Sequence, residues 1–150
     1  MNQYLGIRNI VASPTDFKYL LFYEIDTTDE SIAFALKGVY EKFKTSYIIY
    51  STKNGYHAVG LTPINGLTWG SWFHLLHNRF NEYYGGQTLR ISMKPEEEQK
   101  LFAMNLNYPY VLDLMGKFIT RFKIKQEDIP MYGEPPPYTI VLEKYWSEKD

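Results

Sequence analysis

Apolar and polar positions repeat with two different periods along the chain, and these periods predict an α+β fold. Runs of β-forming residues, largely alternating or apolar throughout, predict strands at residues 4–12, 19–26, 46–52, 56–61 and 87–94. Apolar side chains at helical spacing predict helices at residues 29–44 and 69–83. Between residues 19 and 94 the order is therefore strand, helix, strand, strand, helix, strand.

This order is the β-α-β-β-α-β core of ferredoxin-like and RRM-like folds, in which the helices cover one face of the sheet. The other face is then expected to be open to ligands. Residues 95–150 are expected to extend the core (about 19–94) with a helix at 110–122 and a last strand at 138–146. With 150 residues, the chain is expected to be a single domain, 1–150.

Local signals support several of these boundaries. Thr27 and Glu30 have the spacing of a capping box before the first helix. Asn54-Gly55 is a strong hairpin signal between the second and third strands. Gly38, inside the first helix, indicates close packing against the sheet because glycine otherwise disfavours a helix interior.

The strand at 19–26 becomes acidic at its end. Because side chains alternate along a strand, Leu20, Phe22, Glu24 and Asp26 share one face, and the opposite face is expected to pack under the helices. Two carboxylates at positions i and i+2 point the same way and can share a divalent cation. The alternative is a strand end whose acids meet solvent or pair with lysines.

Other polar residues are expected near the same open face. Ser51, Lys53 and His57 flank the predicted hairpin and could bind phosphate oxygens, although they could also be ordinary turn residues. Arg90 on the last strand of the core could bind a phosphate or the acidic pair, or belong to a half-exposed polar face. His74 and His77, three residues apart on the second helix, are more typical of packing or surface histidines than of metal ligands.

Composition narrows the possible functions. Aromatic residues reach 17%, mostly Tyr, which suits cores, interfaces and base-stacking surfaces alike. The formal net charge of −1 disfavours a protein that holds duplex DNA through many phosphates. The absence of cysteine excludes disulfides and thiolate zinc sites. The chain has no signal-peptide pattern and no apolar run long enough to span a membrane, so a cytoplasmic protein without a membrane partner is expected.

Three segments together resemble the archaeo-eukaryotic primase superfamily, which includes the primase-polymerases of archaeal plasmids and viruses. FYEID resembles the family's acid-hydrophobic-acid strand through Glu24 and Asp26, and YSTKNGYHAVGL resembles its Ser…His hairpin through Ser51 and His57. TLRISMK is similar to the family's arginine-bearing strand through Arg90. The resemblance covers about residues 19–94 and suggests a minimal or degenerate member.

The resemblance implies a domain that binds nucleotide and Mg²⁺ or Mn²⁺ and, if active, performs template-dependent nucleotidyl transfer in DNA replication. Glu24 and Asp26 would be the metal ligands; they and His57 would be catalytic; and Ser51, Lys53, His57 and Arg90 would bind the nucleotide. The implied partners are nucleotides, single-stranded DNA or a primer-template, and replication proteins.

The chain departs from the family pattern in two places. Glu24 stands where the family usually has Asp, and the positions before Arg90 offer no counterpart of the family's third metal-binding acid. The missing third acid favours an alternative, a non-catalytic RRM-like module that binds nucleic acid or a protein. A metal-dependent nuclease that uses the same acids is a further alternative.

Overall fold

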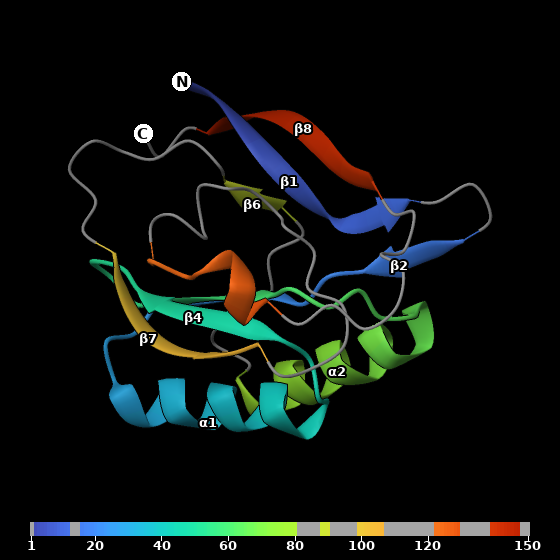
Figure 1. Cartoon of the computed structure of the whole chain (residues 1–150). Coiled ribbons are helices and arrows are strands. Elements are labelled where there is room, and N and C mark those ends of the chain that lie inside the picture. The colour runs from blue at the N-terminus through green and yellow to red at the C-terminus, as the bar shows by residue number, and fades with distance from the viewer. Residues whose placement is uncertain are drawn as a thin grey trace.

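The computed structural model of the chain describes residues 2–12, 16–80, 88–90, 99–106, 122–129 and 139–147 (Figure 1). These residues form an α+β fold with two antiparallel sheets, which confirms the predicted class. The helical elements are α1 (Glu30–Lys42), α2 (Gly66–Arg79) and the 3-10 turn η1 (Gln126–Asp128). The strands are β1 (Asn2–Ala12), β2 (Phe17–Tyr19), β3 (Phe22–Ile25), β4 (Tyr47–Ser51), β5 (Tyr56–Gly60), β6 (Thr88–Arg90), β7 (Lys100–Asn105) and β8 (Thr139–Ser147).

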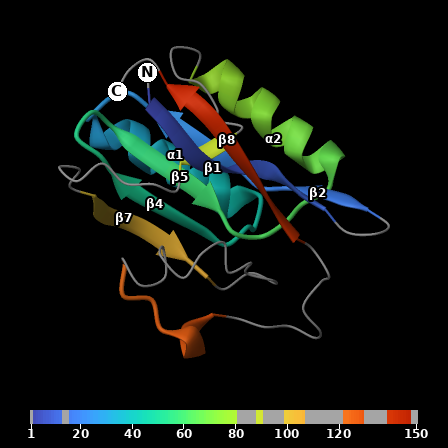
Figure 2. The same cartoon turned by 90° about the horizontal axis from the view of Figure 1, so that it is seen from above.

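The central sheet has the strand order β3-β5-β4-β7, and all of its neighbours are antiparallel. Its first three strands are those predicted before and after the first helix, so the β-α-β-β part of the expected order is present. Figure 2 shows β5, β4 and β7 side by side in this order. In the second sheet, β1 pairs with β2, β6 and β8.

The molecule is layered, with α1 and α2 below the central sheet and β1, β6 and β8 above it (Figure 1). One face of the central sheet carries buried apolar side chains such as Tyr23, Ile49 and Ala58, and they pack against the helices. The helices contribute buried residues from one stripe each: Ala33, Leu36, Val39, Tyr40, Trp72 and Leu76.

The opposite face of the central sheet was expected to be open, but in the structure it is largely covered. Phe22, Ile48 and Val59 on this face form a second core with Ile7 and Val11 of β1. The same core contains residues from the last part of the described chain, Leu106, Ile124 and Ile129. The physical reason is that these strands are apolar on both faces, and a strand of that kind is stable only when both faces are covered.

The fourth strand of the expected core lies elsewhere. Residues 88–90 form β6, which pairs with β1 in the second sheet, with Arg90 opposite Gly6. The edge of the central sheet next to β4 is occupied by β7, a strand that was not predicted from the sequence. A bulge opposite Ile49 and Tyr50 lets Phe102 pack on the helix side, where its ring contacts Tyr56 and Phe34.

Only part of the expected C-terminal extension can be compared with the structure. The strand predicted at 138–146 is present as β8 and pairs along β1. The helix predicted at 110–122 lies outside the described residues, except for Phe122, which is part of a turn.

Both helices begin differently from the prediction. The N-cap of α1 is Asp29, whose carboxylate accepts hydrogen bonds from the Ser31 amide (3.0 Å) and hydroxyl (2.7 Å), and not Thr27. The helix α2 begins at Gly66 because the Asn65 side chain caps it by accepting from the Thr68 amide at 2.8 Å. Gly38 is exposed, and a Cβ added to it would meet no described atom within 4 Å, so it does not mark a close approach to the sheet.

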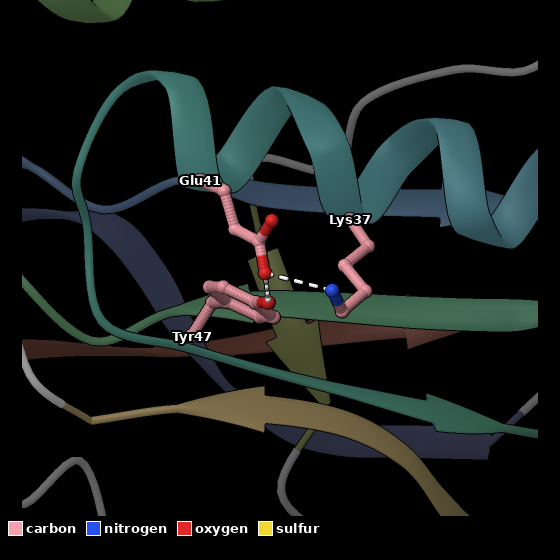
Figure 3. A network of polar contacts seen from close by, with 3 residues as sticks. All are labelled: Lys37, Glu41 and Tyr47. Atoms are coloured by element: carbon pink, nitrogen blue, oxygen red, sulfur yellow. Dashed lines mark hydrogen bonds and ion pairs between the residues drawn. The ribbon is translucent and has the colours of Figure 1, made fainter.

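A polar network joins α1 to the strand that follows it (Figure 3). The Lys37 ammonium donates to Glu41 Oε1 at 2.8 Å, and the hydroxyl of the buried Tyr47 on β4 donates to the same oxygen at 2.9 Å. These hydrogen bonds, first from Lys37 and then from Tyr47, lower the pKa of Glu41 below its ordinary value. The network therefore favours the ionised carboxylate of Glu41 in the folded state.

We expect Glu41→Gln to reduce the free energy of unfolding near neutral pH and to make less difference in acid. A carboxyl group whose pKa is lowered by folding stabilises the fold above its unfolded-state pKa of about 4.3, and this contribution is lost as the pH falls through the folded-state pKa. Urea unfolding of both proteins between about pH 7 and pH 3 measures the difference. Glu127→Gln, at an exposed carboxylate of η1, is the control and should follow the wild type. A pH-independent difference for Glu41→Gln would contradict the assignment.

Candidate functional site

Three polar side chains form a row across the central sheet. Glu24 on β3 is directly opposite His57 on β5, and His57 is directly opposite Tyr50 on β4. Directly opposite residues in antiparallel strands place their side chains on the same face and within contact distance. Glu24 Oε1 lies 3.4 Å from His57 Nε2, and the Tyr50 hydroxyl lies 3.3 Å from His57 Nδ1.

The turn of the β4–β5 hairpin sets the register of this row. The Thr52 amide donates to the Gly55 carbonyl at 2.8 Å, and Ser51 pairs with Tyr56, so the hairpin predicted from Asn54-Gly55 is present. The tip of the hairpin also touches the end of β3, because a Cβ on Gly55 would overlap the Ile25 carbonyl oxygen. Glycine is therefore needed for the hairpin to lie beside the residues that follow Glu24.

Exposure changes along the row. The side chain of Glu24 is 37% exposed and that of His57 is 26% exposed, whereas Tyr50 is buried, at 2%. The Tyr50 ring packs against Phe122, with ring centroids 5.4 Å apart. The covering layer therefore extends over Tyr50, and the row opens to solvent at its Glu24 and His57 end.

The other predicted nucleotide-binding residues are distributed differently. Asp26 is exposed and follows directly after the end of β3, and Lys53 is exposed in the hairpin turn. Ser51 pairs with Tyr56, so its side chain lies on the face opposite to that of His57, and its hydroxyl donates to the Lys100 carbonyl at 3.4 Å. The structure thus brings Glu24 and His57 together and does not bring Ser51 to their face.

Arg90 belongs to the second sheet through the backbone of β6, and its side chain lies outside the described part of the structure. The two helix histidines have ordinary surroundings. His74 Nε2 is 3.3 Å from the Asn78 amide nitrogen, and the His77 ring stacks on Phe73 with centroids 5.2 Å apart. Both contacts fit surface and packing roles.

Tyr50 was not among the candidate residues found in the sequence. It lies in the apolar run SYIIYST, where one tyrosine looks like any other β-forming residue. The only signal that could have revealed it is the hairpin register, because a loop of residues 52–55 places Tyr50 opposite His57.

The exposed end of the row offers the oxygen ligands that a hard divalent cation prefers. Carboxylate oxygens such as those of Glu24 and Asp26 are preferred by Mg²⁺, which commonly uses one or two carboxylates together with water and phosphate oxygens. Burial, followed by the negative charges of Glu30 and Asp29, raises the pKa of Tyr56, the neighbour of His57 on β5. Within the described residues, no group of three or more His, Asp or Glu side chains could hold a metal ion, so a cation here would need ligands from water or substrate.

Comparison with family models, curated proteins and solved structures finds no match for this chain. None of the described helices is long and apolar enough to cross a membrane. The residues of the site are therefore the basis for any functional assignment.

We expect Gly55→Ala to lower the free energy of unfolding by more than about 2 kcal/mol, because the added methyl group would overlap the Ile25 carbonyl oxygen. Gly38→Ala is the matched control, because no described atom lies within 4 Å of a Cβ at that position. Alanine is favoured over glycine in a helix interior, so this variant should be more stable than the wild type by at most about 1 kcal/mol. Urea unfolding of the two variants and the wild type gives both differences. Equal stabilities for Gly55→Ala and the wild type would show that the hairpin tip does not approach β3 as described.

Proposed function

We propose that the chain is a primase-polymerase-like domain that binds a nucleoside triphosphate together with Mg²⁺ or Mn²⁺. The observation that supports this proposal is the meeting of the Glu24 carboxylate and the His57 imidazole at 3.4 Å on a partly exposed end of the sheet. An acidic strand and a histidine-bearing hairpin on neighbouring strands are two of the three features on which the family resemblance is based.

In this proposal Glu24 and Asp26 hold the cation, while His57 and Lys53 contact phosphate oxygens. Ser51 and Arg90 are further nucleotide-binding candidates through the resemblance alone. A bound cation would neutralise phosphate charge and, in an active enzyme, align a primer 3′-hydroxyl with the α-phosphate. The chain's own contribution would be to orient the triphosphate at the end of the row, with single-stranded DNA or a primer-template as partner in the cytoplasm.

A second candidate function is a non-catalytic module that binds single-stranded nucleic acid or a protein. It is favoured by the second sheet and the segment 122–129, which cover much of the face that an open ferredoxin-like sheet would offer to a template. The missing counterpart of a third metal-binding acid points the same way. Such a module would bind single-stranded DNA without metal and without the acids, and would bind it more weakly as salt is raised.

We expect calorimetric titration of a nucleoside triphosphate with Mg²⁺ or Mn²⁺ to show binding to the wild type and a loss of about tenfold or more in affinity for Glu24→Ala/Asp26→Ala. The physical reason is that removal of both carboxylates removes the protein ligands of the cation. Glu127→Ala/Asp128→Ala removes the same charge from exposed positions on η1 and should bind as the wild type does.

Equal binding by the wild type and Glu24→Ala/Asp26→Ala would contradict the proposal. If these two proteins also bind single-stranded DNA equally in the absence of metal, with an affinity that falls as salt is raised, the second candidate is supported instead. Shortening of labelled DNA by the wild type with metal and no nucleotide would indicate a nuclease.

A further inference from the structure

Tyr50 has a buried hydroxyl group aimed at the candidate site. The residue is 2% exposed, its ring packs against Phe122, and its hydroxyl lies 3.3 Å from His57 Nδ1. A phenylalanine would fill the same space without burying a polar group, and burying a hydroxyl is unfavourable unless it is hydrogen-bonded. The contact with His57 gives the hydroxyl a role that packing alone does not provide.

The two partners of His57 determine where its proton lies. A neutral imidazole has one N–H donor and one acceptor nitrogen, whereas a carboxylate can only accept. Because Nε2 lies 3.4 Å from Glu24 Oε1, a neutral His57 is expected to carry its proton on Nε2 and to accept at Nδ1. With the proton on Nε2, the Tyr50 hydroxyl is the donor to Nδ1 across the 3.3 Å contact.

The arrangement matters for a phosphate ligand, because a phosphate oxygen needs a donor and Nε2–H is the donor at the exposed end of the row. When a cation takes the Glu24 carboxylate, Glu24 no longer orients the ring, but Tyr50 still holds Nδ1 from the buried side. We infer that Tyr50 is a positioning residue that keeps the His57 proton on Nε2, so that the imidazole donates to a phosphate oxygen of the nucleotide. The role of Tyr50 in nucleotide binding rests on the proposed function. The hydrogen bond between Tyr50 and His57 depends only on the row of three residues.

The test uses the full chain labelled with ¹⁵N and the Tyr50→Phe variant, at about pH 8, where an imidazole is ordinarily neutral. The ¹⁵N chemical shifts of a histidine ring report which nitrogen is protonated and whether the other accepts a hydrogen bond. The chain has three histidines, so His57→Asn identifies the signals of His57. Tyr56→Phe is the control, because Tyr56 is the neighbour of His57 on the same strand and faces the helices.

We expect Nε2 of His57 to be protonated in the wild type and Nδ1 to have the shift of a hydrogen-bonded acceptor. In Tyr50→Phe the Nδ1 signal should move to the position of an acceptor without a protein donor, and in Tyr56→Phe it should stay. An unchanged Nδ1 signal in Tyr50→Phe, or a proton on Nδ1 in the wild type, would overturn the inference.

A second measurement tests whether Tyr50 contributes to nucleotide binding. Loss of the tyrosine hydrogen bond should weaken nucleotide binding roughly three- to tenfold in Tyr50→Phe, with Mn²⁺ binding in the absence of nucleotide unchanged. Wild-type affinity in Tyr50→Phe would overturn the role in nucleotide binding. A wild type that binds no nucleotide would instead contradict the proposed function, and the ¹⁵N shifts would still decide whether Tyr50 positions His57.

Discussion

The antiparallel register of β3, β5 and β4 is the constraint on which the site depends. Because side chains alternate between the two faces of a strand, a shift of β5 by one residue would turn His57 toward the helices and away from Glu24. Two glycines with close backbone neighbours restrict this register. A Cβ on Gly60 would lie 2.9 Å from the Leu21 side chain, and one on Gly55 would overlap the Ile25 carbonyl.

The two apolar faces of the central sheet strengthen the same constraint. Tyr47 and Ile49 must face the helices, and Ile48 and Tyr50 must face the second sheet, because both cores contain residues that are almost fully buried. A slipped strand would exchange the two sets and disturb both cores at once. The polar row thus lies between two packed layers, and Glu24 and His57 occupy the end where the covering layer stops.

Local signals in the sequence were sufficient to predict three strands of this sheet, β3, β4 and β5, and the helix α1. The apolar run before Glu24, the helical spacing in residues 29–44 and the Asn54-Gly55 turn predicted β3, α1 and the β4–β5 hairpin. The face shared by Phe22 and Glu24 was also correct, and His57 lies beside Glu24 on that face. These predictions depend on periodicity and on a short hairpin, which are local properties.

The pairing of distant segments could not be predicted in the same way. Residues 88–90 look like a core strand in sequence, but their partner is β1, and β7 occupies an edge that the ferredoxin-like order leaves empty. The second layer follows from Ile7, Val11 and Ile124, whose shared core is visible only in three dimensions. Tyr50 was not predicted as a site residue for a related reason, because its role is defined by its cross-strand neighbour and not by the residues next to it in sequence.

The pattern of cross-strand nuclear Overhauser contacts in the central sheet measures this register most directly. The register predicts contacts between backbone protons of His57 and those of its opposite residues, Glu24 and Tyr50. Contacts that place His57 opposite Tyr23 or Ile25 would show a strand shifted by one residue, and would contradict both the site and the functions proposed from it.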